Sequence, residues 1–344
     1  MKVIIVGVAG FIGSQAASRF LDMGASVVGI DNLSRRGASE NLEWLRSRSS
    51  AFEFMWADIR QPNDVRRVFA SHPDVHAILH LAAQVAVTTS VVDPRLDFEV
   101  NALGTLNVLE ATREYCPHAA LLYASTNKVY GALESVGVTE NQGRYTYPDQ
   151  PQGIGEGFPL DFHSPYGCSK GAADQYVRDY ARTYGLRTVV FRQSCIYGTR
   201  QLGLEDQGWL AWFVIATVLG KPFTIYGDGK QVRDVLWVDD LVDLYLKALA
   251  KIEVAKGQVY NAGGGPENTL SLWGLVSLLE SEMGLKITPR MADWRPGDQR
   301  VFIADISKAT RELEWAPKVS PLIGVRQLVT WSMASRDLLR TILG

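Results

Sequence analysis

Residues 3–13 read Val3-Ile4-Ile5-Val6-Gly7-Val8-Ala9-Gly10-Phe11-Ile12-Gly13, and this stretch decides the fold. A run of β-branched apolar residues leads into three glycines spaced as G-x-x-G-x-x-G, and a helical pattern follows. Glycines at these places let the chain turn tightly and let backbone N–H groups approach a pyrophosphate at the helix N-terminus. Three glycines alone are a weak signal. With a strand before them and a helix after them, they predict a dinucleotide site.

Short apolar runs alternate with longer helical patterns as far as about residue 198. Strand, helix and strand in regular alternation indicate βαβ units, and continuous apolar strands indicate a sheet that is buried on both faces. We therefore predict an α/β fold with a Rossmann-like, doubly wound parallel sheet. The predicted strands are residues 3–6, 27–30, 52–56, 78–81, 121–124 and 188–191, and the clearest helices are residues 13–23, 96–114 and 166–184.

The pattern changes after about residue 198. Residues 209–219 and 238–250 are typical of helices, and residues 223–226 and 259–261 of short strands. We predict an NAD-binding Rossmann domain over residues 1–198, with later returns near 231–262. A smaller α/β domain that binds the substrate is expected mainly over residues 199–344.

Asp31 closes the second predicted strand, where a carboxylate can accept hydrogen bonds from both ribose hydroxyls of a dinucleotide. A carboxylate there repels a 2′-phosphate, so NAD is favoured over NADP, although Arg35 and Arg36 argue in the other direction. Asp58 either contacts the adenine or only ends its strand. The residues expected to line the cofactor are Gly7, Gly10, Phe11, Ile12, Gly13, Asp31, Asn32, Ser34, Arg35, Asp58, Ile59, Leu81, Ala82, Ala83, Gln84, Asn101, Tyr166 and Lys170.

Tyr166 and Lys170 are four residues apart on a predicted helix, so their side chains share one face. A free tyrosine titrates at about 10. A nearby ammonium, together with the positive nicotinamide of NAD⁺, favours the phenolate and lowers that pKa. Thr126 follows the fifth strand and supplies a hydroxyl for the substrate oxygen that exchanges its proton. A Y-x-x-x-K pair is common on helices, but after the fifth strand of a dinucleotide fold it predicts a catalytic pair.

Together with the stretch Gln231-Val232-Arg233-Asp234-Val235, these motifs resemble the extended short-chain dehydrogenase/reductase superfamily of sugar-nucleotide enzymes, nearly end to end. Within it, the chain is most similar to the group of CDP-paratose 2-epimerases, also called CDP-tyvelose epimerases. The strings that carry this likeness are Ser125-Thr126-Asn127-Lys128-Val129-Tyr130-Gly131, residues 161–176, and Asp206-Gln207-Gly208-Trp209. One departure is Gln193, where the superfamily often has asparagine near the diphosphate.

The resemblance implies an NAD-dependent epimerase that inverts C2 of a nucleotide-diphosphate hexose, of the CDP-paratose/CDP-tyvelose or CDP-glucose type. Tyr166 would take the proton of the C2 hydroxyl, and a transient 2-keto sugar would form. Arg233 and Arg300 would clamp the diphosphate, since the guanidinium fork binds phosphate bidentately. Trp209 either borders the nucleotide or packs in the protein interior. His163 either reaches the sugar or only caps the helix that follows it. The residues expected to bind substrate are Asn127, His163, Gln193, Gln207, Trp209, Thr224, Tyr226, Arg233 and Arg300.

Three other functions share these motifs. A 4-epimerase uses the same triad with the sugar turned, and the residues alone do not separate it from a 2-epimerase. A 4,6-dehydratase needs an additional acid and base. By the resemblance, such enzymes have Thr-Asp-Glu at the position where this chain has Thr126-Asn127-Lys128. A non-catalytic NAD-sensing module would keep the glycines but need not keep Thr126, Tyr166 and Lys170.

The composition limits the partners. A formal net charge of −2 gives no basic field for nucleic acid or for a membrane surface. Cys116, Cys168 and Cys195 are too scattered for a disulfide framework or a metal cluster, so no metal is expected. No signal peptide or membrane span is recognisable, which favours the cytoplasm. By the resemblance, helices 96–114 and 166–184 pair in a homodimer or a dimer of dimers.

Overall fold

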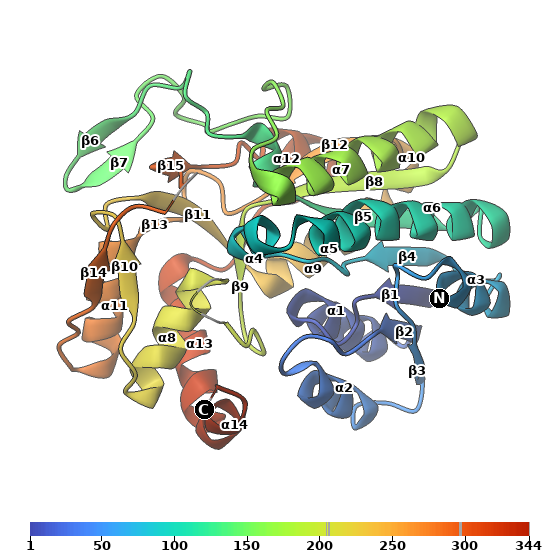
Figure 1. The fold of residues 1–344 in the computed structure, drawn as a ribbon, viewed down its shortest axis with the longest axis horizontal. Helices are drawn as coiled ribbons and strands as arrows, with labels where there is room; N and C mark the ends of the chain where they lie inside the picture. The colour runs from blue at the N-terminus through green and yellow to red at the C-terminus, as the bar shows by residue number, and fades with distance from the viewer. Residues whose placement is uncertain (204, 206, 296–297, 344) are drawn as a thin grey trace.

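A seven-stranded parallel sheet forms the centre of the molecule (Figure 1). The computed structural model describes residues 1–203, 205, 207–295 and 298–343, so Asp206 of the strings quoted above lies outside the described residues. The strand order β12-β8-β5-β4-β1-β2-β3 is that of a doubly wound sheet and confirms the predicted fold class. The strands are β1 (Lys2–Val6), β2 (Ser26–Asp31), β3 (Phe52–Trp56), β4 (Ala77–His80), β5 (Ala120–Thr126), β8 (Arg187–Gln193) and β12 (Val259–Ala262).

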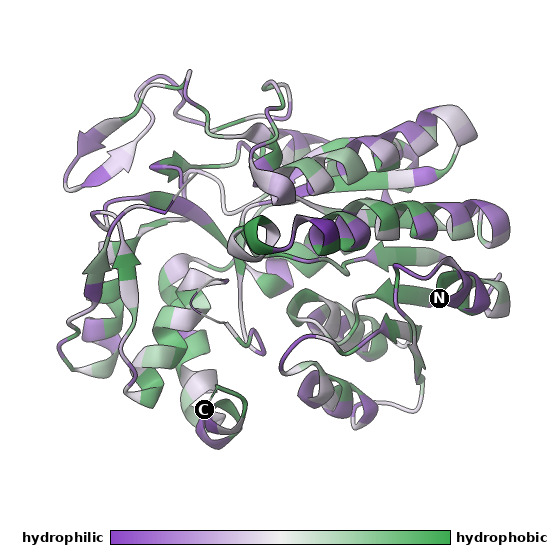
Figure 2. Ribbon diagram, in the orientation of Figure 1, coloured by the Kyte–Doolittle hydropathy of each residue, from purple (hydrophilic) through white to green (hydrophobic). Residues whose placement is uncertain are grey.

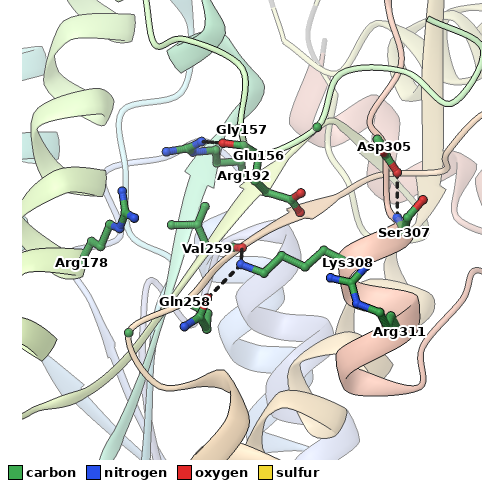
Figure 3. A pocket seen from close by; sticks show the side chains of 12 residues that line it. Glu156, Gly157, Arg178, Arg192, Gln258, Val259, Asp305, Ser307, Lys308 and Arg311 are labelled. Carbon is green, nitrogen blue, oxygen red and sulfur yellow. Dashed lines mark hydrogen bonds between the residues drawn. The ribbon is translucent and has the colours of Figure 1, made fainter.

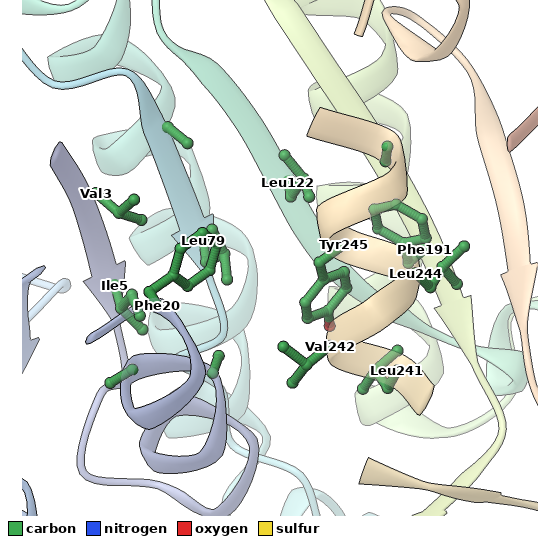
Figure 4. Close-up of a cluster of buried hydrophobic side chains, with 14 of the residues drawn as sticks. Val3, Ile5, Phe20, Leu79, Leu122, Phe191, Leu241, Val242, Leu244 and Tyr245 are labelled. Atoms are coloured by element: carbon green, nitrogen blue, oxygen red, sulfur yellow. The ribbon is translucent and has the colours of Figure 1, made fainter. Parts of the chain in front are cut away.

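Apolar side chains leave the central strands on both faces, because successive residues of a strand point to opposite sides. On one face, Val3 and Ile5 of β1 are buried with Phe20 of α1 (Phe11–Asp22) and Tyr245 of α9 (Val238–Ala250), as Figure 4 shows. On the other face, Ile4 packs with the buried residues of three more helices. These are α3 (Pro62–Ser71), α6 (Gly104–Tyr115) and α7 (Ser164–Tyr184). The two apolar layers leave only strand ends and edges for a polar site.

A second, smaller body lies beyond the carboxyl ends of the main strands. Its sheet contains β9 (Cys195–Tyr197), β11 (Val232–Trp237), β13 (Thr269–Ser271) and β15 (Val301–Phe302). Beside it lie α8 (Trp209–Leu219), β10 (Thr224–Tyr226), α11 (Leu272–Met283), β14 (Arg290–Ala292) and α13 (Pro321–Ala334). The chain enters this body after β8 and returns to the main sheet through α9 and β12. The exact division into two domains stays a prediction.

Most predicted elements agree with the structure to within a few residues, but the helix expected at residues 96–114 does not. It consists of α5 (Pro94–Phe98), a π-helical turn (Glu99–Leu103) and α6. The sequence did not single out the remaining elements. They are α2 (Ala38–Arg46), α4 (Val87–Val92), a 3₁₀ turn (Asn127–Tyr130), β6 (Thr139–Asn141), β7 (Arg144–Thr146), α10 (Ile252–Ala255), α12 (Ser307–Leu313) and α14 (Arg336–Leu343).

The hydropathy of the ribbon follows this layering (Figure 2): the central strands are mainly hydrophobic, and polar residues lie on the outer faces of the helices. In the part of the chain that the structure describes, no helix has both the length and the apolar character needed to cross a bilayer.

Candidate active site

The glycine loop lies between β1 and α1, where backbone replaces side chains. Gly7 has a φ of +88°, and a Cβ there would lie 2.6 Å from the backbone nitrogen of Ala82. A Cβ on Gly13 would collide with the carbonyl oxygen of Gly7. Gly10 caps α1 without a side-chain hydrogen bond, so the first N–H groups of the helix face the loop. This arrangement suits a pyrophosphate, which binds backbone N–H groups at the positive end of a helix.

We expect Gly13→Ala to disrupt this loop, because the added methyl group cannot fit against Gly7. Overpacking of this kind costs about 1–3 kcal/mol of stability, and displacement of the loop should weaken NAD binding at least about tenfold. Gly10→Ala is the matched control, since its Cβ would lie 3.2 Å from the same oxygen and φ at Gly10 is −71°. Calorimetric NAD titration checks both variants, and equal losses would contradict the assignment of Gly13.

Asp31 ends β2 beside the glycine loop. Its carboxylate accepts hydrogen bonds from the backbone N–H of Ala9 at 3.0 Å and of Leu33 at 2.8 Å. Burial raises the pKa of Asp31, and these two hydrogen bonds oppose the rise. Ser34 and Arg35 follow on the exposed surface. The carboxylate is therefore held in place next to the loop, as a ribose-binding acid must be.

Asp58, which follows β3, is already paired with other side chains. Arg60 donates to it from Nη2 at 2.7 Å, and Asn32 donates from Nδ2 at 3.1 Å. The hydrogen bond from Arg60 lowers the pKa of Asp58. These contacts favour the interpretation of Asp58 as a strand-end residue. An adenine contact from Asp58 or from the adjacent Ile59 stays a prediction.

A buried polar cluster connects the loop after β4 to the catalytic helix. Leu81, Ala82 and Ala83 belong to this loop, and Leu81 and Ala82 lie next to Gly7; their contact with a cofactor stays a prediction. The cluster consists of Gln84, Asp97, Asn101 and Ser169.

Asp97 is fully buried at the centre of this cluster. Its carboxylate accepts from Gln84 Nε2 at 2.8 Å, Asn101 Nδ2 at 3.1 Å and Ser169 Oγ at 2.5 Å. Burial raises the pKa of Asp97, which these donors and the charge of Lys170 oppose. The π-helical turn places Asn101 toward the cluster, four residues from Asp97. The sequence analysis missed Asp97 and Ser169; the only signal was the position of Ser169 beside Lys170.

The structure brings Thr126, Tyr166 and Lys170 together at the carboxyl end of β5. Thr126 is the last residue of that strand, and its Oγ1 accepts from Lys128 N at 3.3 Å, which caps the following 3₁₀ turn. Tyr166 lies in the first turn of α7, where the Thr126 hydroxyl lowers its pKa against the effect of burial. One turn later, the ammonium of Lys170 donates to the carbonyl of Ala124 at 2.6 Å.

The electrostatics of this triad differ from the prediction. Burial raises the pKa of Tyr166 to about 12, and the charge of Asp97 adds to the rise. Burial lowers the pKa of Lys170 to about 7, against the carboxylates of Asp174 and Asp97. The prediction that Lys170 lowers the pKa of Tyr166 is wrong for the described groups, because that ammonium bonds Ala124 and lies 4.3 Å over the ring of Tyr123.

A second buried network supports the triad from behind. Asp174 accepts from Ser125 Oγ at 2.7 Å and from the Arg192 guanidinium at 3.0 and 3.1 Å. Both side chains of the Arg192–Asp174 ion pair are almost completely buried. The network therefore joins the ends of β5 and β8 to α7, next to Thr126 and Lys170. The sequence did not indicate it.

Three polar side chains gather on the substrate side of Thr126. Asn127 is buried, with its Oδ1 3.4 Å from Thr126 Oγ1. Lys128 donates to Gln299 Oε1 at 3.2 Å, and burial together with Arg233 lowers its pKa to about 8. The guanidinium of Arg233 lies in the same region and contacts Asp298 Oδ1 at 2.6 Å.

The remaining predicted substrate residues are less closely grouped. The amide of Gln193 donates to the Tyr245 hydroxyl, which positions it at the end of β8. Arg300 is exposed, and its guanidinium lies 5.3 Å from the centre of the Tyr145 ring. His163 is 52% exposed, with Nε2 3.3 Å from Asp161. His163 is the N-cap residue of α7, in agreement with its interpretation as a helix cap, although its imidazole makes no capping hydrogen bond.

The predicted nucleotide contacts lie on the smaller body. Thr224 and Tyr226 alternate on β10, so their side chains share one face. Trp209 begins α8, and its ring packs edge-on against Phe213 with centroids 5.9 Å apart. Gln207 is half-buried just before α8. Among the described residues, no group of His, Cys, Asp or Glu side chains has the arrangement of a metal site.

A glycine loop, an acid at the end of β2 and a Tyr–Lys pair beside a threonine define a class. It comprises dinucleotide-binding α/β enzymes. They take the proton from a hydroxyl group while the carbon that bears it gives a hydride to a nicotinamide. A family model described as GDP-mannose 4,6 dehydratase matches residues 4–328. The CDP-paratose 2-epimerase of Salmonella typhi is 50% identical over 338 residues, which cover 96% of this chain and 99% of that protein.

Two solved structures extend the comparison. The UDP-glucose 4-epimerase of Thermotoga maritima with UDP-glucose has a TM-score of 0.84 at 31% identity, covering 98% of this chain and 100% of that one. A dTDP-glucose 4,6-dehydratase from Streptomyces venezuelae with NAD bound has a TM-score of 0.84 at 27% identity, covering 99% of this chain and 100% of that one. The chain belongs to the extended short-chain dehydrogenase/reductase superfamily of NAD-dependent nucleotide-sugar epimerases and dehydratases.

Proposed function

We propose that the chain is an NAD-dependent epimerase that inverts C2 of a CDP-hexose, of the CDP-paratose/CDP-tyvelose or CDP-glucose type. The observation that carries the proposal is the stretch Thr126-Asn127-Lys128 beside Tyr166 and Lys170. Thr126, Tyr166 and Lys170 are the groups that accompany hydride transfer. Asn127 and Lys128 supply an amide and an ammonium at the positions where enzymes that eliminate water have two carboxylates. The 50% identity to a CDP-paratose 2-epimerase supports C2 as the reacting carbon.

The cofactor residues fit NAD. The glycine loop provides room and N–H groups for the pyrophosphate, and the buried carboxylate of Asp31 fits a ribose without a 2′-phosphate. When bound, NAD⁺ supplies the hydride acceptor and a positive charge beside the phenol. Lys170 would hydrogen-bond the nicotinamide ribose.

Tyr166 carries the proton in the proposed reaction. Its phenolate takes the proton of the C2 hydroxyl, and Thr126 donates a hydrogen bond to the same oxygen while C2 becomes a ketone. Burial raises the pKa of Tyr166 to about 12 against the opposing effect of Thr126, so a positive charge next to Tyr166 would favour the phenolate. The 2-keto sugar turns about its diphosphate linkage and is reduced on the opposite face, while Tyr166 returns the proton. No net oxidation occurs.

Arg233 and Arg300 are proposed to hold the diphosphate during that rotation, and Arg233 is the better placed because it is buried beside Lys128. We expect Arg233→Met to raise KM for the nucleotide sugar about tenfold or more, since a hydrogen bond to a charged group contributes about 1.5–3 kcal/mol. Initial-rate kinetics check this. Asp298→Asn is the control for the ion pair; the same KM increase in both variants would indicate a structural role for Arg233 instead.

A 4-epimerase is the second candidate. The same triad serves it, and the UDP-glucose 4-epimerase fold matches closely. It differs only in which sugar carbon faces Tyr166.

We also propose that the protein acts in the cytoplasm as a homodimer or dimer of dimers. Large apolar side chains of α5, α7 and the π-helical turn are exposed; they include Phe98, Leu103, Tyr176 and Tyr184. Covering such side chains by a second copy would remove them from water. Light scattering of the NAD-loaded protein tests the assembly.

The experiment that tests the reaction is incubation of the enzyme with CDP-glucose, CDP-paratose, UDP-glucose and GDP-mannose in D₂O, followed by NMR. The proposal predicts inversion at C2 of a CDP-sugar, with little solvent deuterium at that carbon. Inversion at C4 would support the second candidate, and loss of water would contradict both.

A further inference from the structure

A basic cavity of about 450 Å³ lies at the edge of the main sheet, beside β12 and between α7 and α12 (Figure 3). Its walls are the glycine-containing loop 155–157, the start of β12 and the first turns of α12. The charged side chains that line it are Glu156, Arg178, Arg192, Asp305, Lys308 and Arg311. Thr126, Tyr166 and Lys170 are not among the lining residues, so the cavity is separate from the candidate active site.

Four cationic and two anionic side chains line the cavity, and one of the cations, Arg311, pairs with Glu312 at 3.0 Å outside the lining. Arg192 is balanced by Asp174 behind the wall. Arg178 forms no ion pair within the described part of the chain, and its Nε is buried without a hydrogen-bond partner there. Among the described residues, Lys308 donates to two neutral oxygens, Gln258 Oε1 and the carbonyl of Val259, both at 2.9 Å.

Neighbouring charges act on two of these cations. Burial is the main cause that lowers the pKa of Lys308; the charges of Glu312 and Glu156 oppose the shift, and those of Arg178 and Arg311 add to it. The pKa of Arg178 is likewise lowered by burial and then by Arg182 and Arg192. Like charges that are held close together destabilise a fold unless an anion lies between them. Figure 3 shows Arg178 approaching from one side and Lys308 with Arg311 from the other.

Two carboxylates also provide hydrogen-bond acceptors in the cavity. Glu156 accepts from Asn261 N at 2.7 Å through Oε1, and Asp305 accepts from Ser307 N at 2.9 Å through Oδ1. In each, the second oxygen has acceptor capacity for a hydroxyl group. The volume is within the range of about 300–1,000 Å³ that holds small ligands.

We propose that this cavity binds a sugar phosphate. Arg178, Lys308 and Arg311 hold the phosphate, and Glu156 and Asp305 accept hydrogen bonds from the sugar hydroxyls. Guanidinium groups suit the phosphate because their planar fork presents two parallel donors.

Calorimetric titration of the NAD-loaded protein with glucose 1-phosphate, glucose 6-phosphate and inorganic phosphate tests the proposal. Saturating CDP is added so that anions do not occupy the proposed diphosphate clamp. We expect saturable binding of at least one sugar phosphate, more tightly than inorganic phosphate, together with a rise in Tm. Absence of sugar-phosphate binding would overturn the proposal, and equal affinity for inorganic phosphate would overturn the sugar contacts.

Variants locate the binding. Arg178→Gln and the exposed Arg311→Gln should each weaken sugar-phosphate binding about tenfold. Arg182→Gln is the matched control, because Arg182 lies one turn from Arg178 on α7 and does not line the cavity. Binding that is undiminished in both variants, or that weakens equally in the control, would overturn the assignment. The surface position of Arg311 keeps the test independent of folding.

Discussion

Replacing Tyr166 by phenylalanine is expected to lower kcat by roughly three orders of magnitude, the range of a lost general acid–base group. The ring of Tyr166 is buried, so phenylalanine keeps the packing and removes only the hydroxyl. Without that hydroxyl, the proposed reaction loses the group that takes the C2 proton. Turnover is measured by NMR of the nucleotide sugar, and NAD affinity by fluorescence quenching.

The matched control is Tyr180→Phe on the same helix. Tyr180 is also buried and donates to Glu110 Oε1 at 2.8 Å, on the far part of α7. This variant should lose some stability and keep its turnover. A Tyr166→Phe enzyme with unchanged turnover would contradict the role of Tyr166 as the proton carrier, and absence of turnover in the unaltered protein would support the non-catalytic NAD-sensing module.

Removing the carboxylate of Asp174 is expected to destabilise the protein by about 3–5 kcal/mol, because Arg192 would remain buried without its partner. The Tm should fall on the order of 5–10 °C. Ser125 would also lose its acceptor, next to Thr126. Since Asp174 raises the pKa of Lys170, Asp174→Ala should lower that pKa further and reduce activity at neutral pH.

Two further variants distinguish the effect of breaking the Arg192–Asp174 ion pair from the effect of replacing any aspartate on α7. Asp179→Ala changes an exposed aspartate on the same helix and should shift Tm by little. The double variant Asp174→Leu/Arg192→Met removes both charges and should recover most of the lost stability, because apolar replacement of a buried pair is often nearly neutral. A single Asp174→Ala variant as stable as Asp179→Ala would contradict the importance of this pair.

The sequence predicts the elements that depend on local pattern. The apolar runs that precede Gly7 and end at Asp31 belong to strands buried on both faces, so they are continuous and easily recognised, and the glycine loop lies at a fixed place between them. Thr126 ends a strand and Tyr166 begins a helix. The alternation of strand and helix patterns along the sequence locates both of these ends. The class of fold and the position of the triad could therefore be predicted.

The supporting networks could not be predicted in the same way. Asp97 meets Ser169, and Asp174 meets Arg192, only after the chain has folded, because these residues come from different elements. Their pairing depends on tertiary packing, which has no local pattern. For the same reason the sign of the pKa shift of Tyr166 was wrong: the shift depends mainly on burial, and spacing shows only that Lys170 is near.

The substrate residues fall between these cases. Arg233 was predicted from the resemblance, and the structure places it with Lys128 near Thr126. Arg300 was predicted from the resemblance alone, and in the structure it is exposed over Tyr145. The proposed contact of Arg300 with the diphosphate would therefore form only when the substrate is bound.

The central claim is that C2 is oxidised and reduced by a hydride that the cofactor retains. The most direct measurement uses CDP-paratose labelled with deuterium at C2, incubated with the enzyme in H₂O and analysed by NMR. We predict a product that is inverted at C2 and still carries the deuterium there. Loss of the label to solvent, or inversion at C4 with C2 unchanged, would contradict the mechanism.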